Sequence, residues 1–173
     1  MSRADYQTST QQALPHHLGE EPPLLPSRMP HPNDDYPWGL RIFRTEVEHA
    51  ELSHLTLPRT FISRSLVAKS RLDDTDLSES FLCWNDFERV SFRAAVLARC
   101  DLRASHFISV DFTDADLSES DLRHSGFAGC TFEGANLSGA ILCEAQAPML
   151  ALSTLQRDSI CWTKDDGAEP DGG

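Results

Sequence analysis

Serine, histidine and aspartate, the side chains of a nucleophilic hydrolase, all occur in this chain, but no motif brings them together. A catalytic triad needs a nucleophile, a base and an orienting carboxylate in mutual contact. Serines and aspartates instead recur at regular intervals around His106 and His124, as members of a repeat do. The sequence also has no glycine-rich phosphate loop that follows a strand and opens a helix. We therefore expect no catalytic activity and no bound cofactor.

Cysteine and histidine spacing gives no indication of a metal site or a disulfide scaffold. The five cysteines are scattered, with no CxxC pair among them, and five is an odd number. A zinc site or a disulfide framework normally shows regular pairing of its ligands or half-cystines. The His16–His17 pair lies in a proline-rich stretch, where we interpret it as a chance neighbour pair. We predict no metal.

The charge balance limits the partners of the chain. It has 173 residues, 27 acids against 15 bases and a formal net charge of −12. Such acidity disfavours direct binding to nucleic acid or to an anionic membrane surface, but it permits a basic protein partner or mimicry of a polyanion. Plain solubility is the simpler explanation. No signal-like segment and no run of eighteen apolar residues appears, so we predict a cytoplasmic protein with no membrane partner.

Large apolar residues recur at every fifth position, a spacing that fits neither a strand nor a helix. The eighteen positions, here called centres, are all apolar. They are Leu57, Ile62, Val67, Leu72, Leu77, Leu82, Phe87, Phe92, Leu97, Leu102, Phe107, Phe112, Leu117, Leu122, Phe127, Phe132, Leu137 and Leu142. Two residues before most centres the side chain is small, and the residue directly before is often Asp or Asn. An internal repeat of this kind is the dominant feature of the sequence.

This pattern resembles the pentapeptide-repeat family, whose consensus is A(D/N)LXX. TDL at 75–77, ADL at 115–117, SDL at 120–122 and ANL at 135–137 match it closely, and the resemblance covers about residues 52–145. It implies an all-β fold, a right-handed quadrilateral β-helix with five residues on each side. The resemblance also implies one candidate role, which is the best known in the family: protection of DNA gyrase by proteins that resemble DNA in size and charge.

The sequence supports four sides independently of the resemblance. From Leu77 the centres run Leu, Leu, Phe, Phe, and this order repeats every twenty residues. Each residue type therefore stacks on its own kind in four columns. We name the sides by their centres: side one begins with Leu77, side two with Leu82, side three with Phe87 and side four with Phe92. The centres and the small residues should point into a narrow shaft, and the other residues outward.

The expected organisation has five parts. Residues 1–35 contain most of the prolines and are predicted to be a disordered tail. Residues 36–55 should form an N-terminal cap, 56–146 a β-helix of about 4.5 coils, 147–163 a C-terminal cap with a short helix, and 164–173 a flexible tail. In the C-terminal cap, Leu155, Ile160 and Trp162 are expected to cover the last leucines.

Two surfaces are candidates for partner binding. The outward residues of side two combine aromatic and basic groups in the manner of a binding hot spot. They are Phe81, Trp84, Arg103, Arg123 and His124. The alternative is that the apolar stretch YPWGLRIF folds back over Phe81 and Trp84. The second surface is acidic and lies around the other sides: Asp73, Asp74, Asp76, Glu79, Asp111, Asp114, Asp116 and Glu119.

The sequence favours a non-catalytic protein–protein interaction module, acting as an adaptor or as an immunity protein against a basic toxin. DNA mimicry of the gyrase or topoisomerase type is an alternative. It is disfavoured because 4.5 coils span only about 22 Å at strand spacing, and because Arg93 and Arg99 interrupt the acids. A purely structural role is a further alternative. The protein partner is unidentified, and the sequence leaves monomer and dimer both open.

Overall fold

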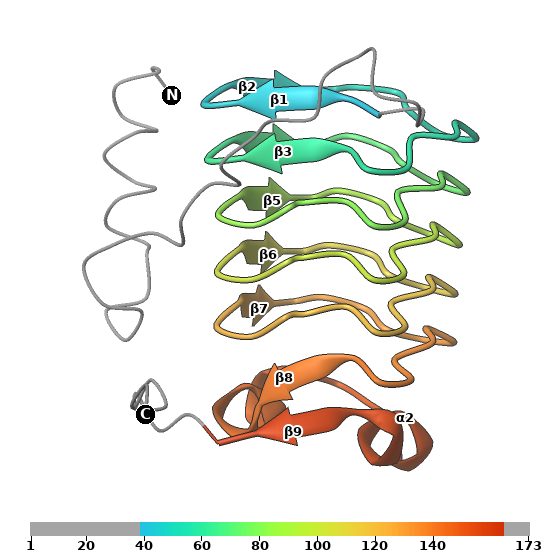
Figure 1. The fold of residues 1–173 in the computed structure, drawn as a ribbon, viewed down its shortest axis with the longest axis vertical. Coiled ribbons are helices and arrows are strands. Elements are labelled where there is room, and N and C mark those ends of the chain that lie inside the picture. Colours follow the sequence, from blue (N-terminus) through green and yellow to red (C-terminus); the bar gives the residue numbers. More distant parts are fainter. Residues whose placement is uncertain (1–38, 165–173) are drawn as a thin grey trace, which may run out of the picture.

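A computed structural model describes residues 39–164, which wind into a stack of square coils closed at one end by a short helix (Figure 1). Each strand is only three residues long, because the chain turns a corner after every side. The strands are β1 (Arg41–Phe43), β2 (Glu46–Glu48), β3 (Phe61–Ser63), β4 (Leu66–Ala68), β5 (Asp86–Glu88), β6 (His106–Ile108), β7 (Gly126–Ala128), β8 (Ile141–Cys143) and β9 (Cys161–Thr163). Two helical turns, η2 (Glu144–Met149) and α2 (Thr154–Ser159), lie near the C-terminal end.

The twenty-residue period is the register of the parallel pairing. On side three, β2, β4, β5, β6 and β7 form one sheet in which Val67 pairs with Phe87, Phe87 with Phe107 and Phe107 with Phe127. Side two has the strand pairs β1–β3 and β8–β9 in the same register, and the remaining contacts between coils are single bridges, such as Asp76 with Val96. The predicted right-handed quadrilateral β-helix is confirmed.

The centres fill the shaft in four columns, as predicted. Phe107 is fully buried and its ring stacks between those of Phe87 and Phe127, with ring centroids 5.2 Å apart on either side. It also meets the edge of Phe112, in the neighbouring column, at 5.5 Å. Parallel rings within a column and edge contacts between columns are both favourable aromatic geometries. These columns supply most of the apolar burial that holds the coils together.

Where the small inward residue is polar, it has a hydrogen-bonding role as well as a packing role. The hydroxyls of Ser105 and Ser125 donate to the carbonyls of Leu82 and Leu102, twenty-three residues earlier, and the Cys100 thiol lies against Leu77 O in the same way. These carbonyls are thereby satisfied inside the shaft.

Asn85 fills the same slot with a buried amide, and its side chain is fully engaged. Its Oδ1 accepts the backbone N–H of Ser65 at 3.0 Å, and its Nδ2 donates to Ile62 O at 2.7 Å. A buried amide requires such partners, because an unpaired polar group in the core is destabilising.

Every corner of the square has left-handed backbone. The residue two positions after each centre has a positive φ from Arg44 to Gly139, but glycine occupies only the last three corners. This conformation turns the chain while the corner N–H still donates to the next coil, as Arg99 N does to Ser118 O at 2.9 Å. Non-glycine residues adopt it at a cost of about 1–2 kcal/mol each, which the stacking has to offset.

The stack begins earlier than the sequence predicted. Ile42 of β1 pairs with Ile62, and Val47 of β2 pairs with Val67, so residues 41–55 form the first coil and not a separate cap. The solenoid has about six turns in place of the predicted 4.5. Residues 36–38 of the predicted cap, and the predicted tails at 1–35 and 165–173, lie outside the described residues.

The C-terminal end closes with one further partial turn. β9 pairs in parallel with β8, placing Trp162 beside Leu142, and α2 precedes it (Figure 1). The amide of Gln156 donates to Phe132 O and Ala135 O, which have no coil beneath them, and Gln146 does the same for Leu122 O and Ser125 O.

The predicted C-terminal helix is present, but only part of its expected cover is. Ile160 is buried, as predicted, whereas Leu155 is 83% exposed and covers nothing. Leu150, which lies between η2 and α2, is buried against the core instead.

Candidate interaction surface

Side two carries the residues predicted to bind a partner, and the structure divides them into two groups. Trp84 is not exposed as predicted: it lies at a corner with a φ of 63° and only 6% of its surface is accessible. It packs against Cys83 and Ala104, and Phe81 is half-buried beside them. Of the two arrangements that the sequence left open for this side, the exposed one does not apply to Trp84, whose indole is buried on the outer face of the coil.

The two arginines lie lower on the same side, in what we call the Asp–Arg ladder: Asp101, Arg103, Asp121 and Arg123. Arg103 donates to both carboxylate oxygens of Asp101 at 2.8 and 2.7 Å, and its Nε lies 3.8 Å from Asp121. Arg123 is bound in the same way by Asp121. The Asp101 hydrogen bond raises the pKa of Arg103 further above its ordinary value. Both guanidinium groups are about one-third exposed, so they are fixed in place yet accessible.

Each aspartate of the ladder also shapes the backbone. Asp101 Oδ1 accepts the N–H of residue 103, and Asp121 Oδ1 accepts the N–H of residue 123. This local side-chain to backbone bond is a preferred use of Asp and Asn next to a turn. The position directly before the centre therefore favours Asp or Asn for a structural reason.

The two predicted histidines lie at different places around the coil. His106 Nδ1 lies 3.0 Å from Asp86 Oδ1 on side three, and His124 Nδ1 lies 4.0 Å from Cys143 Sγ at the end of side two. Ser105 and Ser125, which adjoin them in sequence, turn into the shaft and bond to carbonyls. The arrangement is one of two separate surface pairs.

The predicted acidic surface is less uniform than the sequence indicated. Asp73 is buried and accepts hydrogen bonds from Arg71 and Ser91. Asp76 and Asp116 accept the N–H of the residue two positions on, and Asp111 does so while also pairing with Arg93. Exposed acids occupy two corner columns, one with Asp74 and Asp114 and one with Glu79 and Glu119.

Cations are inserted between these acids. Glu79 lies between Arg59 and Arg99, with N–O distances of 3.1 Å to both. Hydrogen bonds from Arg99 and Arg59 lower the pKa of Glu79. The interruption by Arg93 and Arg99 that the sequence indicated is thus made of direct ion pairs.

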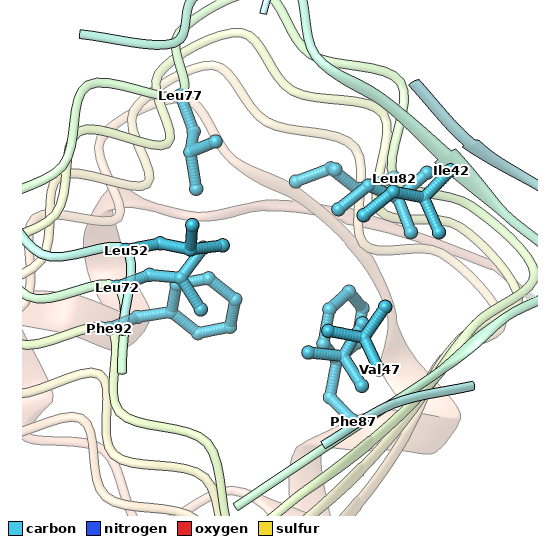
Figure 2. A pocket seen from close by; sticks show the side chains of 10 residues that line it. Ile42, Val47, Leu52, Leu72, Leu77, Leu82, Phe87 and Phe92 are labelled. Carbon is cyan, nitrogen blue, oxygen red and sulfur yellow. The ribbon is translucent and has the colours of Figure 1, made fainter. Parts of the chain in front are cut away.

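The one enclosed apolar space described lies inside the shaft near its N-terminal end (Figure 2). There Val47 and Leu52 of the first coil lie above Phe87 and Phe92, and the smaller side chains leave a gap that the phenyl rings fill in later coils. Only apolar side chains line it, so it offers no polar group to orient a ligand. Across residues 39–164 we find no cluster of three or more His, Cys, Asp or Glu side chains suited to a metal ion.

The cysteines in the described chain are all free thiols. Burial raises the pKa of Cys100 to about 12 and also raises that of Cys83. No helix within residues 39–164 is long and apolar enough to cross a bilayer.

These coils define the class of the protein as a four-sided parallel β-solenoid. A family model for pentapeptide repeats matches residues 86–124 and 127–147 with eight copies, which agrees with the repeat pattern that the sequence predicted. Comparison with curated proteins gave no match.

The solved structures that match this chain are distant in sequence. The pentapeptide repeat protein alr5209 from Nostoc PCC 7120 has 16% identity over 68% of this chain and 80% of its own, with a TM-score of 0.37. The fluoroquinolone resistance protein QnrB1 has 9% identity over 73% and 91%, with a TM-score of 0.21. HetL, a heterocyst differentiation regulation protein from Nostoc PCC 7120, has 20% identity over 61% of each chain, with a TM-score of 0.20. These similarities are too remote to transfer a function.

Proposed function

We propose that this chain is a non-catalytic protein–protein interaction module of the cytoplasm, and that the Asp–Arg ladder with His124 is its contact surface. The observation that carries the proposal is the fixed geometry of Arg103 and Arg123, each of which donates two hydrogen bonds to an aspartate two residues earlier. Arginine is enriched among the residues that dominate binding energy.

The rigid coil favours binding because little has to be ordered on contact. A free arginine side chain loses about 0.5–1.5 kcal/mol of conformational freedom when it docks. In the ladder much of that freedom is already lost in the unbound protein, since aspartates hold the guanidinium groups. The backbone beneath is tied to the coils above and below, so the spacing between the two arginines is also fixed.

The partner we propose is a protein that is basic overall. The exposed corner acids and the net charge of −12 attract such a protein at long range, and the ladder then gives specific contacts. An adaptor and an immunity protein that blocks a basic toxin both fit this description, and identification of the partner separates them.

The test is affinity capture from native cells with a matched pair of double variants. Arg103→Ala with Arg123→Ala removes the basic groups of the ladder, and Arg93→Ala with Arg99→Ala removes two arginines from the other sides for the same change in net charge. We expect the ladder variant to recover the partner at least about tenfold less well, and the control to recover it normally. Equal recovery by both variants would exclude the ladder as the contact surface. Capture of no partner by the wild type would favour a purely structural role.

DNA mimicry is the second candidate, and the columns of corner acids are the feature that favours it. In each column the two acids have one complete coil between them: Asp74 and Asp114 in the first column, and Glu79 and Glu119 in the second. In the second column Arg99 also pairs with Glu79. Double-stranded DNA carries a charge about every 1.7 Å along its axis, which is much denser. We therefore expect no inhibition in a gyrase supercoiling assay, and inhibition at micromolar protein would favour a topoisomerase target.

A further inference from the structure

The outer face of sides two and three carries an apolar strip in the second and third coils, formed by Phe61, Leu66, Phe81, Cys83 and Trp84. Phe61, Leu66, Phe81 and Cys83 adjoin inward centres, so strand alternation directs them away from the shaft. Trp84 lies at the corner that follows Cys83. The rings of Phe61 and Phe81 stack in parallel with centroids 5.2 Å apart, and Trp84 packs beside them on Cys83. The Asp–Arg ladder continues the same side below the strip.

Four of the five side chains of the strip are buried although they face outward, and Phe81 is half-buried. Phe61 is 2% exposed, Leu66 5% and Cys83 0%. Ile108, at an outward position of side three two coils below β4, is 44% exposed. An outward position on the coil therefore does not by itself explain why the side chains of the strip are buried. An apolar surface of this kind needs a cover from outside the square stack.

Trp84 indicates what chemistry the cover brings. Its indole Nε1 is buried and has no acceptor among residues 39–164. The indole N–H is a donor only, and a buried donor without a partner is strongly unfavourable. The covering group must therefore supply an oxygen acceptor together with apolar surface.

We propose that the proline-rich segment of residues 15–38 packs along this strip as an extended chain. Seven of the ten prolines lie between Pro15 and Pro37, and Tyr36 and Trp38 add aromatic surface. Proline-rich chains bind aromatic grooves in an extended form, and proline offers a carbonyl acceptor without adding an N–H donor. That chemistry complements a stacked aromatic strip with an unpaired indole donor.

The attachment point delivers the segment to the strip. Gly39 N–H donates to Pro58 O and Leu40 N–H donates to Thr60 Oγ1, both at 2.9 Å, so the chain enters the coil next to Phe61. A side chain at Gly39 would clash with the Thr60 hydroxyl and the Leu57 carbonyl, which explains glycine at this entry. The proposed segment is long enough to reach the whole strip. Any seven of its residues in an extended form span about 20 Å, which exceeds the distance along the stack between two coils spaced about 4.8 Å apart.

The strip is then an intramolecular docking surface, and only the Asp–Arg ladder of side two stays open to a partner. This inference does not depend on the proposed function, because it concerns different residues. Of the two alternatives that the sequence left open for Phe81 and Trp84, it corresponds to the one in which they are covered.

The test measures the labelling rate of Cys83 in the full chain with a maleimide and peptide mass spectrometry. The exposed Cys161 in the same molecule is the internal reference. Trp38→Ala changes the proposed docking segment and leaves the sequence of the coil unchanged, and Tyr6→Ala removes an aromatic residue outside that segment as the matched control. We expect Cys83 to be labelled at least about tenfold faster in Trp38→Ala than in the wild type, and unchanged in Tyr6→Ala.

Two outcomes would overturn the proposal. If Cys83 is labelled at the same rate in the wild type and in Trp38→Ala, the segment does not cover the strip. If protection of Cys83 in the wild type falls on dilution of the protein, a second copy of the chain is the cover. An unchanged Cys161 rate and a single cooperative thermal unfolding transition show that the variants are folded.

Discussion

Truncating Phe107 to alanine tests the stacked phenyl column directly. Phe107 is fully buried, and it loses two parallel ring partners and one edge contact on truncation. A buried Phe→Ala change typically destabilises a protein by about 3–5 kcal/mol, and each aromatic pair contributes about 0.5–1.5 kcal/mol within such totals. With three ring contacts removed, we expect a loss near the upper end, about 4–5 kcal/mol.

Urea unfolding followed by circular dichroism is the assay, with a thermal melt beside it. For a chain of this length the expected loss corresponds to a fall in Tm of about 8–20 °C. Phe127 has one parallel ring neighbour in its column and is 6% exposed, so Phe127→Ala should lose less, about 3 kcal/mol.

Ile108→Ala is the matched control for this prediction. Ile108 follows Phe107 in β6 but faces outward and is 44% exposed, so its truncation should change stability by no more than about 0.5 kcal/mol. Equal losses for Phe107→Ala and Ile108→Ala would refute the division of each side into one inward centre and outward neighbours.

Three further predictions concern hydrogen bonds, charge and corners. Asn85→Ala should destabilise the fold by about 1–3 kcal/mol, because the two buried groups that bond to the Asn85 side chain lose their partner. Asn85→Ser introduces the residue that fills the same slot one coil later, and its loss of stability in a urea titration should be about half as large or less. Burial acts to raise the pKa of Asp73, but hydrogen bonds from Ser91 and Arg71 outweigh it and hold the pKa below 3.8. Its stabilisation is therefore complete above that pH and is lost as the pH falls further; the slope of stability against pH in that acid range should be smaller in Asp73→Asn. Ala94→Gly, at a corner with a φ of 52°, should stabilise the fold by about 1 kcal/mol, and Gly129→Ala, at a corner with a φ of 64°, should destabilise it by about the same amount. The melting temperature should rise slightly in the first variant and fall slightly in the second.

The spacing of the centres predicted the fold because burial and register impose the same period. One large residue must point inward on each side, and identical residues stack when coils pair in parallel. The Leu, Leu, Phe, Phe order therefore predicted both the number of sides and the columns. The first coil escaped prediction because its positions before the centres are charged or bulky, such as Arg41 and Glu46, and lack the Asp or Asn signature.

Outward residues were predicted less well than inward ones. Their periodic position says that they leave the shaft, but their exposure depends on what lies over them and on the corner conformation. Trp84 and Cys83 point outward yet are buried. The acids were also sorted by local bonds that the repeat alone does not reveal, such as Asp76 Oδ1 with the N–H of Ser78.

The register of twenty has a consequence for changes in chain length. Deleting one complete turn from the middle of the stack, such as residues 97–116, would bring Leu117 beneath Leu77 and leave every vertical neighbour of the same type. Deleting a single pentapeptide would keep the hydrophobic spacing but move each later group of side chains a quarter-turn around the axis. The proposed contact surface would then be redirected while the interior stayed apolar. Length can vary freely in this molecule only in whole turns, and a loss of one fourth of a turn acts as a rotation of the surface.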